Sequence, residues 1–306
     1  MIHIEGITKQ YPTKVLFDNA SVHLRPETRV GMVGRNGTGK TTLLRMILGE
    51  DTPESGTIRL RPWLRLGYLS QELDSLGNYT VLEAAHRDQY PEHEAKRILS
   101  GLGFKETDWH RKLDTFSGGY RMRVVLGHLL LSNPDVLLLD EPTNHLDKAT
   151  QRWFESFLLS SNMTMVLISH DTTFLNKLST HIWEIRDHTI QEYHGNYVKF
   201  QKARAQQDAQ KSSFAERQAK EVARVQQFVD RFRYKANKAR QVQSRIKQLE
   251  KVKLVEIKRD TKRLRFKFPE PPASGKQVLE LQAAAKAYGD NVIYESLDFS
   301  IERGQR

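Results

Sequence analysis

The stretch GRNGTGKT at residues 34–41 decides the expected fold. It satisfies the pattern G-x-x-x-x-G-K-[ST], in which glycines allow backbone N–H groups to wrap around phosphate oxygens. An apolar run precedes it at residues 30–33, and a helical pattern follows it at residues 41–48. The sequence therefore predicts a loop between a buried strand and a helix N-terminus, where the helix dipole also favours an anion.

The side chains of this loop have separate expected roles. We expect Lys40 to neutralise β- and γ-phosphate oxygens and the Thr41 hydroxyl to ligate Mg²⁺. A glycine-rich turn without a ligand is the alternative, and the flanking strand and helix patterns disfavour it. The predicted phosphate-binding residues are Gly34, Arg35, Asn36, Gly37, Thr38, Gly39, Lys40, Thr41 and Thr42.

Three more polar residues lie at the ends of predicted buried strands. Asp140 and Glu141 close the run that begins with VLLL at residue 136, and His170 follows MTMVLIS at residues 163–169. In a parallel sheet such ends meet at one edge, where ligands bind. A carboxylate there is costly without a purpose. We predict that Asp140 holds Mg²⁺ through water, that Glu141 orients or deprotonates the attacking water, and that His170 hydrogen-bonds the γ-phosphate.

Composition changes twice along the 306-residue chain, which is too long for one ordinary core. Residues 1–196 alternate strand-like and helical patterns, as α/β domains do. Residues 197–268 contain no glycine or proline and read as helix, and FPEPPASGK at residues 268–276 ends that pattern. We expect a first α/β domain, a helical linker and a third segment, at residues 1–196, 197–268 and 269–306.

The predicted linker is strongly basic. It holds 22 Lys or Arg against 7 Asp or Glu, a net +15 that exceeds the +11 of the whole chain. Apolar residues recur at steps of three or four from Val222 to Leu249, which predicts an antiparallel helical hairpin, and we place its tip at residues 231–240. The charge indicates a polyanionic partner. A solvated helix pair that contacts nothing is the alternative.

The third segment repeats the first. Aligning Tyr11 with Tyr288 pairs apolar positions throughout both segments, and Arg306 then falls on Arg29. In the first copy the phosphate-loop motif follows Arg29 almost at once, whereas the sequence given stops at Arg306. We therefore expect a second α/β domain, interrupted before its own phosphate loop.

Composition also indicates the compartment. The chain has no cysteine, which excludes disulfides and cysteine-ligated zinc and fits a reducing compartment. It has no apolar run of the roughly 18 to 20 residues that cross a bilayer, and its start lacks a signal-peptide pattern. We expect a cytoplasmic protein that does not contact membranes.

A further motif indicates the class. FSGGYR at residues 116–121 resembles the signature motif LSGGQ of the ATP-binding-cassette superfamily, with Phe116 in place of Leu and Tyr120 in place of Gln. A helical pattern follows at residues 122–131. The resemblance implies an α/β P-loop NTPase fold with a mixed sheet core and a helical subdomain, which binds and hydrolyses ATP with Mg²⁺.

The resemblance also assigns roles to individual residues. Gln71 looks like the glutamine that senses Mg²⁺ and the γ-phosphate, so it joins Glu141 and His170 as a catalytic residue. Tyr11 sits where the superfamily stacks an aromatic ring on adenine, with a core tyrosine as the alternative. HLD at residues 145–147 looks like the D-loop. The implied metal ligands are Thr41, Gln71 and Asp140.

In the superfamily two cassettes enclose ATP head to tail. The residues of the signature motif, Ser117, Gly118 and Gly119, would therefore act on nucleotide held by a partner cassette. That partner is expected to be the second cassette of a longer chain or a second copy of this one. With one complete set of motifs, the chain is expected to bind ATP–Mg²⁺ but to hydrolyse it weakly without a partner.

Three sequence motifs indicate which group of the superfamily the chain resembles. They are EPTNHLD at residues 141–147, SHDTTFL at 169–175 and YHGNY at 193–197. Together with the basic linker they resemble the ABC-F group, soluble proteins with two cassettes joined by a helical linker. This resemblance implies ATP-dependent binding to the ribosome near the tRNA exit site. The linker would approach peptidyl tRNA and rRNA, to which its charge is suited. The expected tip contacts are Arg231, Arg233, Lys235, Lys238 and Arg240.

Other readings remain open from the sequence. A nucleotide-binding subunit of a membrane transporter would share the phosphate loop, signature and Glu141, but it needs no basic hairpin. A related cassette protein whose linker binds branched DNA would share the hairpin charge as well. A non-enzymatic, ATP-gated scaffold is the third reading, and the presence of both Glu141 and His170 argues for turnover instead.

Overall fold

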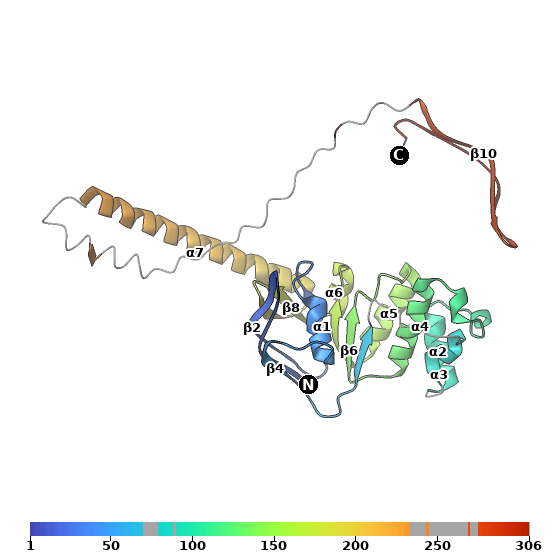
Figure 1. The fold of residues 1–306 in the computed structure, drawn as a ribbon, viewed down its shortest axis with the longest axis horizontal. Helices are drawn as coiled ribbons and strands as arrows, with labels where there is room; N and C mark the ends of the chain where they lie inside the picture. The colour runs from blue at the N-terminus through green and yellow to red at the C-terminus, as the bar shows by residue number, and fades with distance from the viewer. Residues whose placement is uncertain (70–78, 88–89, 233–242, 245–268, 270–274, 306) are drawn as a thin grey trace. The chain divides into compact units, whose positions relative to one another are not determined.

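The computed structural model describes residues 1–69, 79–87, 90–232, 243–244, 269 and 275–305. The chain divides into two compact units, Met1–Val255 and Glu256–Arg306, and each is described by itself. The first unit holds two sheets and most of the helices (Figure 1). The second contains a two-stranded antiparallel ribbon, β10 with β11.

A six-stranded sheet forms the centre of the first unit, in the order β5-β6-β7-β3-β8-β9. All neighbours are parallel except β8 and β9, which form an antiparallel pair. The three short apolar runs predicted as buried strands are β3, β6 and β7, and every residue of β6 and β7 is buried. The strands are β3 (Arg29–Val33), β5 (Leu66–Leu69), β6 (Val136–Asp140), β7 (Thr164–Ile168), β8 (His181–Arg186) and β9 (Thr189–His194).

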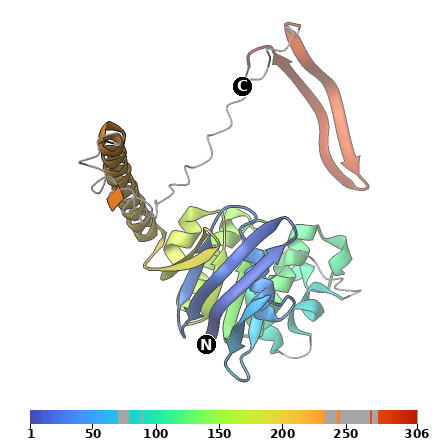
Figure 2. The same ribbon diagram turned by 60° about the vertical axis from the view of Figure 1, so that its left-hand side comes forward.

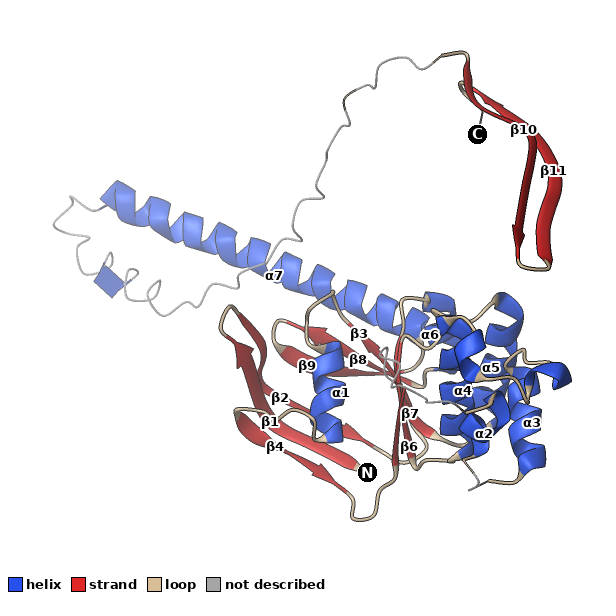
Figure 3. Ribbon diagram, turned by 45° about the vertical axis from the view of Figure 1, so that its right-hand side comes forward, coloured by secondary structure: helices blue, strands red, loops and turns tan. Residues whose placement is uncertain are grey.

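A second, antiparallel sheet has the order β2-β1-β4, and helix α1 lies beside it (Figure 3). Alternate residues of β1 and β2 are buried, as expected for a sheet with one face on a core. That face shares one apolar cluster with α1 and the central strands. These elements are β1 (Ile2–Tyr11), β2 (Lys14–Leu24), β4 (Ser55–Leu60) and α1 (Lys40–Leu48).

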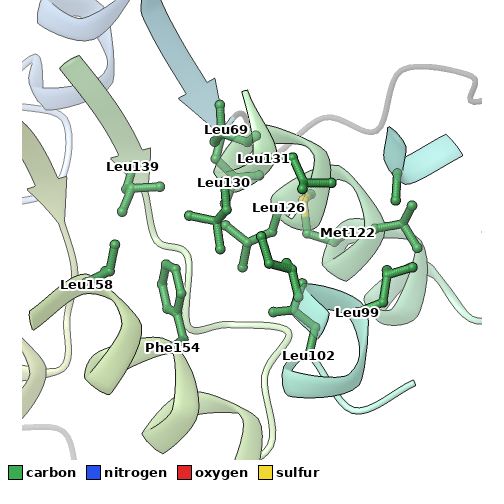
Figure 4. Packing of buried hydrophobic residues seen from close by; sticks show 14 of the residues in the cluster. Leu69, Leu99, Leu102, Met122, Leu126, Leu130, Leu131, Leu139, Phe154 and Leu158 are labelled. Atoms are coloured by element: carbon green, nitrogen blue, oxygen red, sulfur yellow. The ribbon is translucent and has the colours of Figure 1, made fainter. Parts of the chain in front are cut away.

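Five helices pack with buried residues of β5, β6 and β7 in a second apolar cluster (Figure 4). Helix α4 lies at its centre, because Met122, Leu126 and Leu130 reach residues of the neighbouring helices and of β5 and β6. The helices are α2 (Val81–His86), α3 (Glu92–Gly101), α4 (Gly118–Leu131), α5 (Lys148–Ser160) and α6 (Thr172–Leu178), with short 3-10 turns at Glu106–Asp108 and Leu113–Thr115. The fold is the expected α/β P-loop cassette with a helical subdomain.

Helix α7 (Tyr197–Phe232) is one uninterrupted helix at the C-terminal side of the first unit's described residues, seen nearly end-on in Figure 2. Near its end Val222 and Val225 are partly buried and Val229 is buried, in agreement with the predicted apolar stripe. The rest of the predicted hairpin lies outside the described residues, as do the tip positions 233–240.

The internal repeat is confirmed by strand register. In the first hairpin Tyr11 faces Lys14, and Tyr288 faces Asn291 in the ribbon formed by β10 (Gln277–Tyr288) and β11 (Asn291–Glu302). The same correspondence holds along both hairpins, and their bulges interrupt the pairing at equivalent places. Even a side-chain bond recurs, because Gly6 N donates to Ser21 Oγ at 2.8 Å and Ala283 N donates to Asp298 Oδ1 at 2.7 Å.

The packing of α5 predicts a contrast between adjacent residues. Leu158 is 0% exposed and Leu159 is 45% exposed. Leu158→Ala should lower the free energy of unfolding of the first unit by about 2–5 kcal/mol, because it opens a cavity in the core. Leu159→Ala, the matched control, should cost less than about 1 kcal/mol. Urea unfolding followed by circular dichroism measures both values, and equal losses would contradict this packing.

Candidate nucleotide-binding site

The phosphate-loop motif lies between β3 and α1, as predicted. Gly39 precedes the helix with φ 102°, and Gly37 has φ 72°, both in the region that favours glycine. No side chain caps this helix N-terminus, so its N–H groups are oriented for an anion. A β-carbon at Gly39 would lie 3.0 Å from the Phe17 ring. The loop is therefore shaped by glycine and closed from behind by β2.

The ammonium group of Lys40 contacts the backbone of the phosphate loop. Lys40 Nζ donates to the carbonyl oxygens of Gly34 at 2.9 Å and Arg35 at 3.1 Å. Burial lowers the pKa of Lys40, although the charges of Glu141 and Asp140 oppose that shift. Its ammonium group thus sits inside the loop, held by carbonyls that a phosphate oxygen would replace.

The predicted Mg²⁺ ligands Thr41 and Asp140 are brought together. Thr41 Oγ1, on the first turn of α1, donates to Asp140 Oδ2 at 2.7 Å. Asp140 ends β6 and is 4% exposed. A hydroxyl beside a carboxylate, next to an open helix N-terminus, is a donor set that suits Mg²⁺ with its retained waters. The third predicted ligand, Gln71, lies outside the described residues.

Glu141 and His170 meet where β6 and β7 end. Glu141 has φ 51°, an uncommon conformation for its residue type, and is 8% exposed. Its Oε2 accepts a hydrogen bond from His170 N at 3.2 Å, and His170 Nε2 lies 3.4 Å from its Oε1. Among the described residues, buried Oε1 has no hydrogen-bond partner. A buried acceptor without a partner suits an attacking water.

Tyr11 lies at the surface, at the turn between β1 and β2, with 47% of its area exposed. The alternative of a core tyrosine is therefore wrong. Its hydroxyl donates to Asp51 Oδ2 at 3.2 Å, and Lys9 Nζ lies 5.4 Å from the ring centre. Lys9 bonds the same carboxylate at 2.6 Å and thereby holds the pKa of Asp51 below its usual value. The exposed ring of Tyr11 can still stack on a nucleobase, although its hydroxyl is hydrogen-bonded to Asp51.

The signature residues start helix α4. Ser117 is the N-cap residue, and its side chain makes no capping bond, while Gly118 and Gly119 form the first turn. The helix begins four residues before the predicted pattern at residue 122, because the glycine pair is itself helical. Its first turn presents backbone N–H groups at a second anion-type helix end.

The two departures from the signature consensus are neighbours in space. Phe116 and Tyr120 lie 5.8 Å apart between ring centres, and each lies within 5.8 Å of Phe104. The Arg111 guanidinium lies 4.4 Å from the Phe116 ring centre. The substitutions therefore act together, as one aromatic cluster that packs the start of α4 against the helical subdomain.

Arg123 was not singled out by the sequence patterns, although it joins two motifs. It is 7% exposed on α4 and donates to Leu102 O at 3.2 Å, His145 O at 3.2 Å and Asp147 Oδ2 at 3.0 Å. Asp147 also caps α5, and the backbone bond from Thr150, followed by the bond from Arg123, lowers its pKa. One buried guanidinium thus fixes the predicted D-loop, residues 145–147, against the signature helix.

Lys14 is a second residue that the sequence reading missed. It begins β2, and its Nζ donates to the carbonyl of Gly37 at 2.6 Å, at the crest of the phosphate loop. A lysine 23 residues away in the sequence is not part of the phosphate-loop pattern, so only the fold reveals the contact. It links the hairpin of β1 and β2, whose turn carries Tyr11, to the phosphate loop.

The predicted linker contacts are largely beyond the described structure. Arg231 lies exposed in the last turn of α7. The other four, Arg233, Lys235, Lys238 and Arg240, lie outside the described residues. Their role stays a prediction.

Comparison with known sequences agrees with this site. The chain matches the family described as ABC transporter over residues 17–144, and a domain with the same description over residues 183–268. The probable ATP-binding protein YheS of Escherichia coli K12 is 34% identical over 340 aligned positions, covering 100% of this chain and 53% of that protein. ABC transporter F family member 2 of Arabidopsis thaliana is 29% identical, covering 100% and 52%. The chain therefore spans about half the length of these curated relatives.

Solved structures share the fold at low identity. The ATP-binding cassette MJ0796, solved as a dimer bound to ADP and Pi in a post-hydrolysis state, has a TM-score of 0.54 and 22% identity, covering 63% of this chain and 98% of its own. A bacterial Atm1-family ABC exporter with ATP bound has a TM-score of 0.58 and 20% identity, covering 66% and 40%.

Fold, phosphate loop and signature helix together define an ATP-binding-cassette protein. The domain that follows the cassette and the alignments that cover the whole of this chain are more specific, and the chain belongs to the ABC-F group. Within the described part of the chain, no helix is both long enough and apolar enough to cross a bilayer.

The Lys14 contact predicts a loss of nucleotide affinity. Lys14→Met removes a charge-assisted bond that orients the loop, so the Kd for a non-hydrolysable ATP analogue should rise roughly 5- to 10-fold. Lys211→Met, an exposed lysine on α7, is the matched control and should leave the Kd unchanged. Isothermal titration calorimetry measures both, and an unchanged Kd for Lys14→Met would show that the contact is incidental.

Proposed function

We propose that the protein is a cytoplasmic ATPase of the ABC-F type, which binds the ribosome near the tRNA exit site and modulates translation through its basic linker. The observation that carries the enzymatic part is the buried Oε1 of Glu141, which has no hydrogen-bond partner among the described residues and lies 3.4 Å from His170 Nε2. That oxygen lies at the sheet edge where Lys40 and the Thr41–Asp140 pair gather. Four polar groups converging there fit hydrolysis of a triphosphate better than a scaffold role.

In this proposal each residue performs one task. Lys40 binds the β- and γ-phosphate oxygens, and the Thr41–Asp140 pair holds Mg²⁺, which neutralises phosphate charge when bound. Glu141 orients the attacking water and accepts its proton, and His170 donates a hydrogen bond to the γ-phosphate. Tyr11 stacks on adenine. Gln71 completes the metal set as its resemblance to the family's glutamine implies.

Hydrolysis further requires a second cassette. The first turn of α4 has no side-chain cap, so its N–H groups and Ser117 suit the γ-phosphate of nucleotide bound by a partner. The similar cassette MJ0796 is a dimer in its post-hydrolysis state. We infer that the partner is the second cassette of a longer protein, or a second copy of this chain.

Dependence on a partner predicts the kinetics. ATPase turnover per chain should be low when the chain is dilute and should rise with its concentration, because an isolated cassette lacks the signature residues that face its own nucleotide. Phosphate release at a fixed excess of ATP, over a hundredfold range of chain concentration, measures this. Turnover that is high and independent of concentration would contradict the proposal.

The ribosomal part rests on the linker. Residues 197–268 carry a net +15, which suits the phosphate backbone of rRNA and of peptidyl tRNA. The contacts are proposed at Arg231, Arg233, Lys235, Lys238 and Arg240. A family model described as ABC transporter matches residues 183–268, which supports a linker of the ABC-F type here. Branched DNA offers a similar charge pattern, and the experiment below separates the two nucleic acids.

Substitution of Glu141 should trap the ribosome complex. Glu141→Gln keeps the size of the side chain but cannot accept the proton of water, so ATP binds and is hydrolysed at least about 100-fold more slowly. In a two-cassette protein the equivalent glutamate is substituted as well. Sedimentation through a sucrose cushion should then recover the variant with ribosomes in ATP but not in ADP.

Two controls complete this experiment. A Lys40→Ala variant should bind neither ATP nor ribosomes, because the phosphate contact is lost. Retention on duplex or branched DNA with none on ribosomes would refute the ribosomal assignment while leaving ATP hydrolysis intact.

A further inference from the structure

Glu184 is a buried charge that the nucleotide chemistry does not use. It lies on β8 with 3% of its area exposed, where an unpaired carboxylate would be strongly unfavourable. Its Oε1 lies 3.0 Å from Arg204 Nε, and its Oε2 accepts a bond from Tyr193 OH at 3.2 Å. Arg204 is half-exposed and belongs to α7. A core charge of the cassette is thus paired with the linker helix.

More polar contacts join the same face of α7 to the hairpin of β8 and β9. Tyr193 OH lies 2.9 Å from Gln207 Oε1, and Arg186 Nη1 donates to Asp208 Oδ1 at 2.8 Å. Arg204, Gln207 and Asp208 are spaced three and four residues apart, so they share one face of the helix. Burial, followed by the charge of Glu184, raises the pKa of Tyr193 to about 12, so its hydroxyl stays protonated and able to donate well above neutral pH.

An apolar layer beneath this network reaches the strand that carries the phosphate loop. Ile182, Tyr193 and Phe200 are buried together, and Tyr197 and Val33 pack against them. Val33 is the last residue of β3 and directly precedes Gly34. The first turns of α7 and Val33, the residue directly before the phosphate loop, therefore belong to the same apolar cluster.

The end of β8 also packs closely against the start of that loop. Glu184 is the register partner of Val33 across the parallel pair β3–β8. A β-carbon at Gly34 would approach the carbonyl oxygen of Ile185 to 2.9 Å, so the backbones are in close contact. Close-packed segments transmit a displacement instead of absorbing it. A shift of the β8 end would move the phosphate loop.

We propose that Arg204 is a positioning residue that couples helix α7 to the phosphate loop through Glu184, so that the base of the linker is part of the nucleotide site. The coupling is reciprocal, as any linkage between two binding events must be. Nucleotide that orders the loop also orders the first turns of α7, and a polyanion bound along α7 changes nucleotide affinity. This inference rests on the proposed binding of ATP.

The test measures nucleotide affinity and helix order in the full chain. Arg204→Met should raise the Kd for a non-hydrolysable ATP analogue at least about fivefold, the lower range of common coupling effects. It should also abolish the slowing of hydrogen–deuterium exchange that the analogue causes over residues 197–210. Arg204→Lys keeps the charge and should restore part of both responses.

Two further variants separate coupling from folding. Arg217→Met removes an exposed arginine from the same helix and should match the wild type in both measurements. Glu184→Gln combined with Arg204→Met leaves no unpaired buried charge, so it should recover thermal stability while the coupling stays lost.

The outcomes are distinct. If Arg204→Met and the double variant bind the analogue with wild-type Kd and show the wild-type exchange response, the network is only a structural brace and the inference is overturned. If the wild-type chain binds no analogue, the proposed function fails and the coupling fails with it. If Arg217→Met reproduces the effect of Arg204→Met, loss of helix charge is the cause, and the role of the Glu184 pair is refuted.

Discussion

The structure depends on the burial of two carboxylates, Asp140 and Glu141, where an apolar strand of the central sheet ends. Strand β6 supplies four buried apolar residues before Asp140, and Glu141 follows in a left-handed conformation. Such groups are tolerable only where hydrogen bonds or cations meet them. Here the Thr41 hydroxyl and the His170 backbone do so from neighbouring elements. The phosphate loop, the Thr41–Asp140 pair and Glu141 are thus brought together by one requirement, that buried carboxylates be hydrogen-bonded.

Much of the fold was predictable, because its signals are local. Continuous apolar runs located β3, β6 and β7 to within one residue at each end, since a strand covered on both faces has no polar alternation to confuse its bounds. The phosphate loop needs glycines at set positions, so its pattern is specific. The structure excludes a core position for Tyr11, which nothing in the local sequence distinguished from a core residue, and its contact with adenine stays a prediction.

The remaining site residues have no local signal. Lys14 contacts Gly37, Arg123 contacts the backbone of Leu102 and His145, and Arg204 reaches Glu184, each across about 20 residues or more. No period or spacing marks a charged residue whose partner is set by how strands and helices assemble. From the sequence alone these charged residues are expected at the solvent-exposed surface, where most residues of their types lie. Only the three-dimensional arrangement separates the exceptions.

The paired hairpins show what a duplicated segment retains. In the second copy Ala283 stands where the first has Gly6, yet it keeps the same left-handed backbone, with φ 46° against 59°. Alanine in that region is strained by about 1 kcal/mol relative to glycine. The second hairpin thus keeps the bulge without glycine, the residue best suited to that conformation. The backbone geometry of the β1–β2 and β10–β11 hairpins is therefore more similar than their side chains. It preserves the sign of a common origin at positions where the residues differ.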